Sequence, residues 1–338
     1  MAEVIGDASA LLEALSEAGL IALDGRIIAS NAAARALLGE GIDGNPLDRV
    51  IAHPAAIEAL DRLGSDEADE VELAGLGGSR RHWLMRSAPL AGGAHLIRFV
   101  DRSEARAAEQ MRVDFVANAS HELRTPLSTL IGYTETLREQ SGEIDADTRE
   151  RFLAVVHDEA RRMQRIVEDL ISLSRIEAEK FNAPTEAIGL PPLIEHSLAN
   201  VRRAAEERGS RLVCEIEDDL PEIAGDRGEI LQLLDNLVTN ALRYGEPGTP
   251  VTVSAHKEGP MVRLSVRDEG EGIAPEHIAR VTERFYRVDT SRSRSLGGTG
   301  LGLSIVKHIV ERHRGRLNIE SRLGRGTAVH VLLPAALS

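Results

Sequence analysis

The stretch "SHELRTPL" places one histidine among residues that could assist it in chemistry. His121 is followed directly by an acid, Glu122, and four residues later by a hydroxyl group, that of Thr125. Neutral imidazole is a good nucleophile near pH 7, and a neighbouring carboxylate can orient the ring or accept its proton. Pro126 removes one backbone donor and permits a local bend, which suits a helix that flexes as another domain docks. The alternative is an exposed histidine without a role.

The helix that must carry this histidine is amphipathic. With Leu123 as reference and about 100° per residue, one apolar stripe lies within about 40° of it. His121 lies about 160° away, and Thr125, one turn later, shares the face of His121. The stripe consists of Val116, Ala119, Leu123, Leu127, Leu130, Thr134 and Leu137, and a second stripe of Val156, Ala160, Met163, Val167 and Leu170.

The stretch "EQSGEIDADT" separates the two stripes and predicts a helical hairpin. Asp147 is the residue that we expect to cap the second helix, because its side chain can accept backbone N–H groups. Two helices alone cannot enclose a core. The pattern therefore predicts a homodimer in which two hairpins form a four-helix bundle.

Polar residues recur inside a Leu-rich helix farther along the chain. "LLDNLVTNALRY" places Asn236 and Asn240 at i and i+4, on one helical face. Polar groups in such a helix need partners, and a Mg²⁺ ion that also binds phosphates would be one. Helix capping or a satisfied core amide is the alternative.

Three glycine-containing stretches follow. "RDEGEGI" puts Asp268 at the end of an apolar strand, ahead of Gly270 and Gly272, whose backbone can approach a ring closely. "LGGTGLGLSIVKHIV" leads into an apolar helix, whose N-terminus favours phosphate. It matches neither a P-loop nor a dinucleotide fingerprint. In "GRGTAVHV", a plain hairpin turn explains Gly324 and Gly326 equally well.

The elements around these stretches alternate between helices and strands and predict an α/β sandwich. We expect helices at 192–209, 226–244 and 303–314, strands at 212–216, 251–256 and 261–268, and a closing hairpin at 317–333. Residues 1–101 predict strands around an Asp24-Gly25 turn, a short helix after Asn31, and two strands joined by a Gly-Gly turn.

On these residues the chain resembles the sensor histidine kinases of two-component systems. "SHELRTPL" is similar to the family's phosphoacceptor box. The resemblance implies that His121 accepts the γ-phosphoryl group of ATP, that Glu122 is the general base, and that Thr125 helps to remove phosphate from the partner. The partner is the receiver domain of a response regulator, which accepts the phosphoryl group on an aspartate. The arrangement is most similar to the phosphate-regulon type.

The asparagine and glycine stretches, in their order, resemble the N, G1, G2 and G3 boxes of the kinases' ATP-binding domain, which is related to the GHKL ATPases. The resemblance implies that Asn240 is the main Mg²⁺ ligand with support from Asn236. It also implies that Asp268 bonds the adenine amino group and that Tyr244 lines the base pocket. The further implied ATP contacts are Arg243, Gly270, Gly272, Arg287, Gly298, Gly300, Leu301, Gly302 and Thr327.

The segment "ERFYRVD" resembles the family's F box, and the polar residues after it resemble a lid over the phosphates. Arg287, Arg292 and Arg294 are candidates to neutralise phosphate charge there. Arg243 departs from the family, which often has lysine at this position, but both side chains are cationic.

The N-terminal 100 residues resemble a PAS sensor domain. We expect no cofactor in it, because a flavin adduct needs a cysteine and the chain's one cysteine, Cys214, lies far away. His53 and His82 could ligate haem but are more typical of surface residues. The expected fold is multidomain α+β: a PAS-like α/β domain at 1–102, the dimerising hairpin at 103–180, and a GHKL-type (Bergerat) α/β sandwich at 186–338.

Composition excludes several other classes. The formal net charge of −14 argues against nucleic-acid binding, which needs basic patches. No apolar run approaches the roughly 20 residues of a membrane span, so we expect a cytoplasmic protein or the cytoplasmic portion of a membrane-associated kinase.

Another GHKL ATPase, such as a chaperone, would lack the histidine and the hairpin. A non-catalytic adaptor would carry damaged nucleotide boxes, whereas these are intact.

Overall fold

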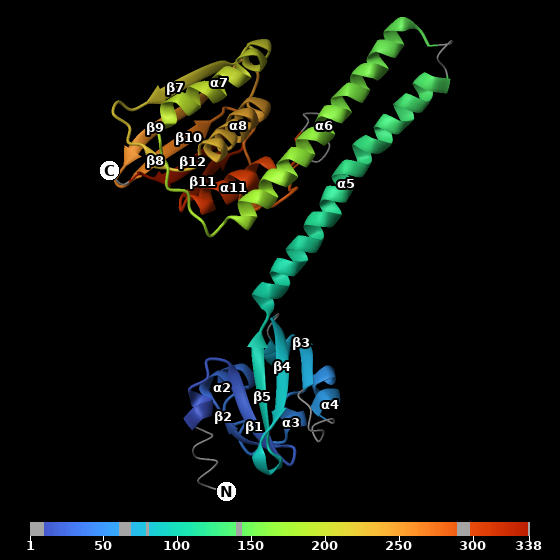
Figure 1. Ribbon diagram of the computed structural model, residues 1–338, viewed down its shortest axis with the longest axis vertical. Coiled ribbons are helices and arrows are strands. Elements are labelled where there is room, and N and C mark those ends of the chain that lie inside the picture. The colour runs from blue at the N-terminus through green and yellow to red at the C-terminus, as the bar shows by residue number, and fades with distance from the viewer. Residues whose placement is uncertain (1–9, 61–68, 79–80, 140–143, 289–297, 337–338) are drawn as a thin grey trace. The chain divides into compact units, whose positions relative to one another are not determined.

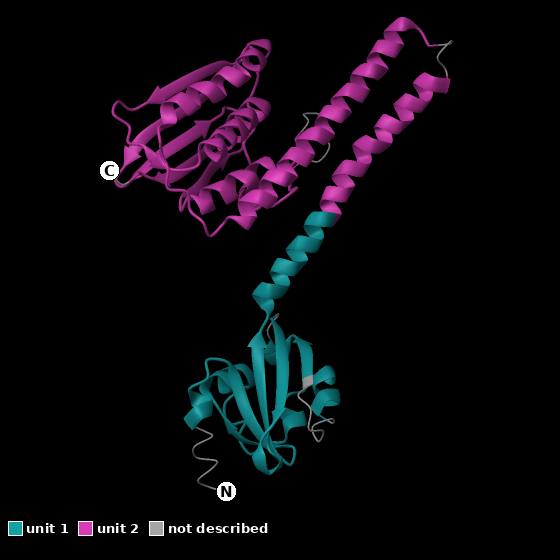
Figure 2. Ribbon diagram, viewed as in Figure 1, with its two compact units in different colours: residues 1–116 teal, residues 117–338 magenta. Residues whose placement is uncertain are grey.

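The computed structural model describes residues 10–60, 69–78, 81–139, 144–288 and 298–336. The chain forms two compact units, residues 1–116 and 117–338 (Figure 2). Figure 1 gives the order of the helices and strands. Among the described residues, no helix has both the length and the apolar character that a membrane crossing requires.

Unit 1 is built on a five-stranded antiparallel sheet in the order β2-β1-β5-β4-β3. Short helices contribute apolar side chains to the core that covers it, so that Leu20, Ile27 and Phe99 of the sheet are buried together with Ala34 and Leu47 of the helices. The elements are β1 (Ala18–Leu23), β2 (Arg26–Ser30), α2 (Ala32–Leu38), α3 (Leu47–Val50), α4 (Pro54–Leu60), β3 (Asp69–Ala74), η1 (Leu76–Gly78), β4 (His82–Pro89), η2 (Ala91–Gly93) and β5 (His95–Asp101).

The turns predicted for this unit are confirmed. Asp24 and Gly25 connect β1 to β2 with φ values of 49° and 71°, the left-handed backbone that a tight hairpin needs and that Asp and Gly tolerate. The glycine pair before Ala94 lies between β4 and β5 as expected. Asn31 precedes α2 and caps it.

Asn31 also holds separate segments of unit 1 together. Its Oδ1 accepts the backbone N–H groups of Gly19 at 3.0 Å and Ala34 at 2.8 Å. Its Nδ2 donates to three carbonyl oxygens of the segment 12–17, at 2.7–3.3 Å. The residue is 1% exposed. Buried backbone groups need hydrogen-bond partners. The side-chain amide of Asn31 supplies them to an N–H at the start of α2, to an N–H of β1 and to carbonyl groups of the N-terminal segment.

Two long helices, α5 (Ser103–Glu139) and α6 (Ala146–Ala178), confirm the predicted pair of helices. Part of the stretch between them, residues 140–143, lies outside the described residues. The prediction that Asp147 caps α6 is wrong. Asp145 is the N-cap, and its Oδ1 accepts the N–H of Thr148 at 2.7 Å. The helix begins one residue after Asp145, so Asp147 falls in the first turn, where an acid favours the helix dipole.

Much of the hairpin's apolar surface is exposed in the single chain. The exposed fractions of Val116, Leu127, Ile131, Leu153 and Ile171 lie between 45% and 65%. The side chains of α6 that are fully buried are instead Ile166, Leu173 and Ile176. Of the predicted stripes, Val116, Leu127 and Val167 are exposed, while most of the other members are half-buried.

The C-terminal part of unit 2 is a mixed five-stranded sheet in the order β11-β12-β10-β9-β7, with helices packed against it (Figure 1). Strands β7 and β9 pair in parallel, and the other neighbours are antiparallel. The predicted helices and strands are present to within a few residues, whereas β6, β8 and α9 were not predicted. The elements are β6 (Ala187–Ile188), α7 (Leu190–Glu207), β7 (Arg211–Ile216), β8 (Ile223–Ala224), α8 (Arg227–Tyr244), β9 (Pro250–Glu258), β10 (Met261–Arg267), α9 (Pro275–Ile278), α11 (Gly302–Arg312), β11 (Arg316–Arg322) and β12 (Gly326–Pro334).

Helix α8 is oriented by its leucine-rich face. Leu233, Leu234 and Leu237 are at most 2% exposed. Its start is fixed by Asp226, whose Oδ1 accepts the N–H of Glu229 at 3.0 Å. The remaining face, which carries the two asparagines of the sequence analysis, is thereby left to line a cavity.

We predict that Asn31→Ala destabilises unit 1 by about 2–4 kcal/mol, because the helix loses its cap and several buried backbone groups lose their partner. Trp83 is the chain's only tryptophan and lies in β4, so its fluorescence during denaturant unfolding reports on this unit. The control is Asn45→Ala, since the Asn45 side chain makes an exposed hydrogen bond to Gly41. Equal unfolding midpoints for the two variants would contradict the role given to Asn31.

Candidate functional site

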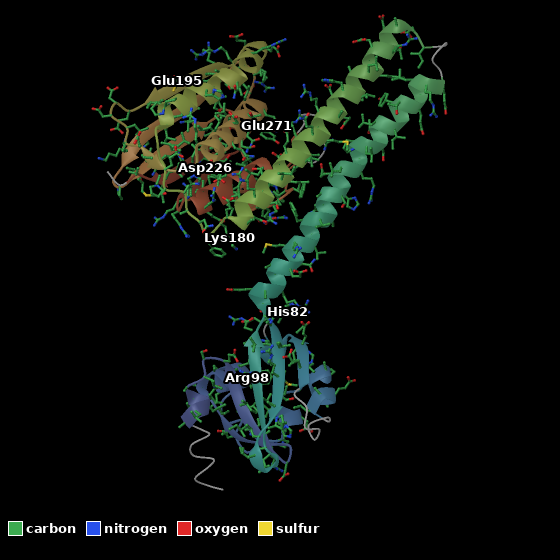
Figure 3. All side chains as sticks on the ribbon, viewed as in Figure 1. His82, Arg98, Lys180, Glu195, Asp226 and Glu271 are labelled. Carbon is green, nitrogen blue, oxygen red and sulfur yellow. The ribbon has the colours of Figure 1, made fainter. Side chains whose placement is uncertain are left out.

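A cavity of about 1470 Å³ lies in unit 2 where α8, the end of β10 and the glycine-rich segments meet. Side chains of α6 contribute to its wall. Glu271, labelled in Figure 3, is one of the lining residues. Of the predicted nucleotide contacts, the cavity is lined by Asn236, Asn240, Arg243, Tyr244, Asp268, Gly270, Gly272, Arg287, Gly298, Gly300, Gly302 and Thr327.

The two asparagines of α8 face the first turn of α11. A Cβ added to Gly302 would lie 2.9 Å from Asn236 Oδ1 and 3.6 Å from Asn240 Nδ2, so the Asn236 side chain would have to shift to admit a larger residue. Among the described residues, no cluster of three or more His, Cys, Asp or Glu could hold a metal ion alone. Amide oxygens do suit Mg²⁺ when phosphates complete its coordination.

Asp268 is a buried carboxylate at the end of β10. It is 7% exposed, and its Oδ1 accepts the N–H groups of Gly270 at 2.9 Å and Thr327 at 3.3 Å. Burial raises the pKa of Asp268, and these two hydrogen bonds act in the opposite direction. Both of these hydrogen bonds use Oδ1, and Oδ2 offers acceptor sites for a further donor.

The glycines around Asp268 are required by crowding. A Cβ on Gly270 would lie 2.0 Å from the carbonyl oxygen of Tyr244, and one on Gly326 would lie 2.1 Å from that of Asp268. Gly272 has a φ of +73° and would place a Cβ 2.1 Å from the Arg322 carbonyl oxygen. Gly326 is therefore needed where the start of β12 passes the backbone of Asp268, next to the lining residue Thr327.

The second glycine segment leads into α11. Gly300 has a φ of +75°, and its carbonyl oxygen accepts the N–H of Phe285, a non-glycine residue with a φ of 62°. Leu301 is fully buried and anchors the start of the helix. The free N–H groups of a helix start attract an anion. Arg292, Arg294 and Gly297 lie outside the described residues.

Arg243 and Tyr244 occupy the last turn of α8. Burial lowers the pKa of the Arg243 guanidinium, and the Tyr244 hydroxyl acts in the opposite direction. Tyr244 is 46% exposed, so its ring lines an open part of the cavity.

His121 and Thr125 lie on an exposed face of α5, as predicted, and neither lines the cavity. The Thr125 hydroxyl donates to the carbonyl oxygen of His121 at 3.3 Å. Glu122 is more constrained, because its Oε2 accepts from Nη2 of Arg162 and from Nη2 of Arg287, both at 3.0 Å. Arg287 also lines the cavity, so it joins the acid beside His121 to the nucleotide-binding region.

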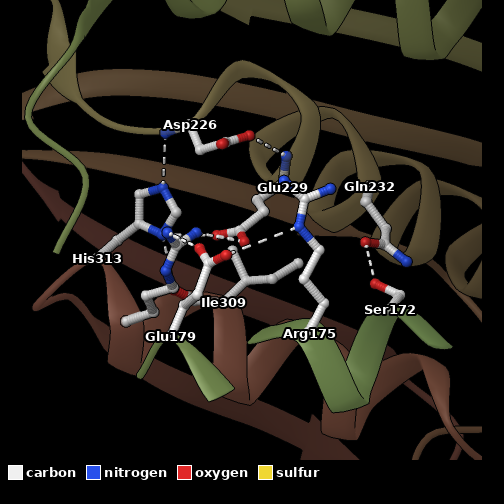
Figure 4. A network of polar contacts seen from close by, with 9 residues as sticks. Ser172, Arg175, Glu179, Asp226, Glu229, Gln232, Ile309 and His313 are labelled. Carbon is white, nitrogen blue, oxygen red and sulfur yellow. Dashed lines mark hydrogen bonds and ion pairs between the residues drawn. The ribbon is translucent and has the colours of Figure 1, made fainter. Parts of the chain in front are cut away.

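A buried polar network joins the end of α6 to α8 and α11 (Figure 4). Arg312 donates to Glu179 at 2.5 Å and also pairs with Glu229. His313 Nε2 accepts the N–H of Asp226 at 3.0 Å, and its Nδ1 lies 2.8 Å from the carbonyl oxygen of Ile309. These partners assign one acceptor and one donor nitrogen, which fits a neutral ring and the lowered pKa that burial gives His313.

A second polar contact lies near the C-terminal end of α6. Glu177 pairs with Arg284, and its Oε1 lies 3.5 Å from Nε2 of His308. Burial, together with nearby cations, lowers the pKa of His308 to about 4. His308 is therefore neutral near pH 7, and Arg284 supplies the positive charge at this contact.

Sequence reasoning missed the part of the cavity wall that α6 and Arg208 supply. Arg165 and Asp169 of α6 line the cavity, and so does Thr299, within a glycine stretch that we had singled out. The spacing of Arg165 and Asp169 along α6 does not by itself indicate that another domain packs there. The one available signal was that Asp169 is a polar residue between the apolar residues Ile166 and Leu173.

Two stretches of the chain match known protein families. Residues 111–179 match the His Kinase A (phospho-acceptor) domain. Residues 225–337 match the histidine kinase-, DNA gyrase B-, and HSP90-like ATPase. The residues around His121 fall in the first stretch, and the candidate cavity residues from Asn236 to Thr327 fall in the second.

Curated relatives extend the likeness over most of the chain. The phosphate regulon sensor protein PhoR of Pseudomonas aeruginosa is 34% identical over 309 residues, which are 90% of this chain and 68% of that protein. The sensor protein SrrB of Staphylococcus aureus is 38% identical over 230 residues, which are 67% of this chain and 38% of that protein. The chain thus spans about two thirds of the first relative and well under half of the second.

Solved structures show the same architecture. Full-length ShkA in complex with AMPPNP is 27% identical, with a TM-score of 0.50 over 68% of this chain and 46% of that one. The histidine kinase ThkA in complex with the response regulator protein TrrA is 21% identical, with a TM-score of 0.55 over 96% of this chain and 98% of that one. At that identity the second likeness concerns the fold.

Proposed function

This chain belongs to the sensor histidine kinases of two-component systems, of the phosphate-regulon type, and carries their ATP-dependent protein-histidine kinase domains, in which we propose that His121 is the phosphoacceptor. A nitrogen of the imidazole forms a bond to the γ-phosphorus of ATP as the bond from that phosphorus to the bridging oxygen breaks. ADP leaves, and the proton lost from the ring goes to a base. Support comes from the exposure of His121 and from its place in the phosphoacceptor stretch.

Glu122 is the base in this proposal. It is the carboxylate next in sequence to His121. Two arginines share its Oε2. Release of Arg287 from Glu122 would leave that oxygen open to the imidazole N–H, so we place proton acceptance after that contact opens.

We propose that the cavity of unit 2 binds ATP. The observation that carries this proposal is the buried Asp268, with an acceptor oxygen beyond its two backbone partners, in a cavity that also receives the start of α11. Asp268 would bond the adenine amino group, with Tyr244 beside the base. Phosphates would lie toward Gly298, Gly300, Leu301 and Gly302, with Arg243 and Arg287 as cations. Gly270, Gly272 and Thr327 complete the wall near Asp268.

Mg²⁺ is the metal that the site fits. Asn240 would be its main protein ligand and Asn236 the supporting one, because both amides meet the first turn of α11 at Gly302. When bound, Mg²⁺ would neutralise charge on the phosphates.

The partner that we propose is the receiver domain of a response regulator, which takes the phosphoryl group from His121 onto an aspartate. ThkA, a relative in fold, is described in complex with such a regulator. The same surface of α5 presents the hydroxyl of Thr125 one turn from His121. Thr125 would hold a water in line with the phosphoaspartate and so help to remove phosphate from the regulator.

We propose a homodimer with a four-helix bundle at its centre. Its support is the row of exposed apolar side chains on both helices, including Leu127 and Ile131 of α5 and Ile171 of α6. Contiguous exposed apolar surface of this kind is typical of an interface.

We propose a division into a PAS-like domain at 1–102, the hairpin at 103–180 and the ATP-binding domain at 186–338. The strand order of unit 1, β2-β1-β5-β4-β3, supports the PAS assignment. We expect this domain to carry no cofactor, and an absorption spectrum of the purified protein tests that expectation. The expected cytoplasmic location remains part of the proposal.

We predict that His121→Gln abolishes incorporation of label from γ-labelled ATP while the nucleotide still binds, because acceptor and cavity are separate. The label in the wild type should be labile in acid and stable in alkali. His157→Gln, which changes an exposed histidine of α6, is the matched control and should retain labelling. Labelling of His121→Gln at the wild-type rate would mean that another residue is the acceptor.

We predict that Thr125→Ala separates two activities. Autophosphorylation should stay within a few-fold of the wild-type rate, because it does not use this hydroxyl. Dephosphorylation of the regulator should fall by roughly 10–100-fold, the value of one positioning hydrogen bond. The control is Thr134→Ala. Thr134 lies more than two helical turns from Thr125, and its hydroxyl makes the same kind of bond, to the carbonyl oxygen of Leu130. An equal fall in both activities would point to distortion around Pro126 instead.

We predict that analytical ultracentrifugation gives a molecular mass of twice the chain mass of 36.6 kDa. Ile131→Glu should shift it toward the monomer, because a charge would be buried in the bundle. Leu323→Glu places the same charge on a residue of the ATP-binding domain that is 64% exposed, and this variant should remain a dimer. A wild-type monomer at micromolar concentration would refute the bundle.

A further inference from the structure

The cavity of unit 2 is closed partly by a helix that lies outside the ATP-binding domain. Arg165 and Asp169 of α6 line it together with Thr299 and Arg243. The candidate phosphate-binding region thus takes a carboxylate from the hairpin. A negative side chain in a cavity for a polyanion needs an explanation.

Asp169 is bonded to the glycine segment itself. Its Oδ2 accepts from the hydroxyl of Thr299 at 2.8 Å. The same hydroxyl oxygen accepts the N–H of Leu301 at 3.2 Å, and Thr299 is 9% exposed. One hydroxyl therefore connects the Asp169 carboxylate to a backbone N–H at the start of α11.

The charges around Asp169 are those that a phosphate would use. Burial raises the pKa of Asp169, while the Thr299 hydroxyl, Arg165 and Arg243 act to lower it. Two guanidinium groups and the Thr299 hydroxyl thus act on this one carboxylate, and the same hydroxyl accepts the first N–H at the start of α11. Arginines and free helix N–H groups are also the usual partners of phosphate oxygens.

We infer that Asp169 is an intramolecular competitor of the nucleotide's phosphates, and that nucleotide binding releases it, and with it α6, from Thr299. This inference rests on the proposed ATP site. In the nucleotide-free chain the carboxylate bonds to Thr299 and draws the hairpin onto the cavity. A phosphate at the start of α11 repels the carboxylate and takes over the N–H groups and arginines that act on it.

Reciprocity follows from this competition. If the nucleotide weakens the contact of α6 by some factor, then the closed contact weakens nucleotide binding by the same factor. The apparent affinity of the wild type is reduced by the fraction of molecules in which the contact is closed. Removing the charge of Asp169 should therefore tighten binding, whereas loss of an ordinary wall residue would weaken it.

The test compares the dissociation constants of AMPPNP with Mg²⁺ for full-length variants by calorimetry. Asp169→Asn keeps the size of the side chain but removes its charge, and we expect binding roughly 3–10-fold tighter. Asp158→Asn makes the same change at a carboxylate of α6 that is 84% exposed, and we expect less than about a two-fold change. Asp268→Asn is the control for the site and should weaken binding.

Hydrogen exchange of residues 166–176 gives a second measure. In the wild type, exchange should rise when AMPPNP is added, and in Asp169→Asn it should be higher already without nucleotide. Unchanged or weaker binding by Asp169→Asn, or equal tightening by Asp158→Asn, would overturn the inference. If Asp268→Asn also binds as the wild type does, the proposed ATP site itself is wrong.

Discussion

The packing of α6 on the ATP-binding domain determines what surrounds the cavity. Ile166, Leu173 and Ile176 are buried within one arc of the helix, about 80° wide at about 100° per residue, that also bears Asp169. Glu179, the C-cap of the helix, adds a bond to Arg312. Burial of three aliphatic side chains contributes about 1.5–3 kcal/mol each, whereas a typical hydrogen bond contributes a net 0.5–1.5 kcal/mol. The apolar residues therefore supply most of the attraction. The polar contacts set the register, because a shifted helix would leave buried charges without partners.

The network in Figure 4 illustrates that constraint. The Arg312 side chain is 8% exposed and that of Glu229 is 10% exposed, so their pairing compensates two desolvated charges. Glu179 of α6 adds a second acid to Arg312. Separation of α6 from this domain would remove that second acid but leave the pair within the domain intact. The pairing of Arg312 with Glu229 thus does not depend on α6, which suits a contact that opens and closes.

The sequence predicted best what depends on local pattern. The hairpin turn at Asp24-Gly25 and the short helix after Asn31 follow from residue type, and the asparagines of α8 follow from their spacing against a leucine stripe. Prediction failed where long-range packing decides. Two acids compete for the cap of α6, and the strand pair β6–β8 has only two residues on each side, too short for a periodicity. Asp169 lines the cavity only because the ATP-binding domain packs against α6. The residue pattern of one helix does not show which domain packs against it.

The hairpin therefore presents different surfaces to different partners. One arc of α6 meets the ATP-binding domain, while apolar residues such as Ile131 and Ile171 stay exposed and form the surface of the proposed dimer. His121 stays exposed on α5, but the acid beside it is bonded through Arg287 to the wall of the cavity. The Arg287 side chain is only 5% exposed, so it must exchange partners to approach a phosphate and cannot simply extend into water. One guanidinium group therefore connects the wall of the cavity to the acid beside His121.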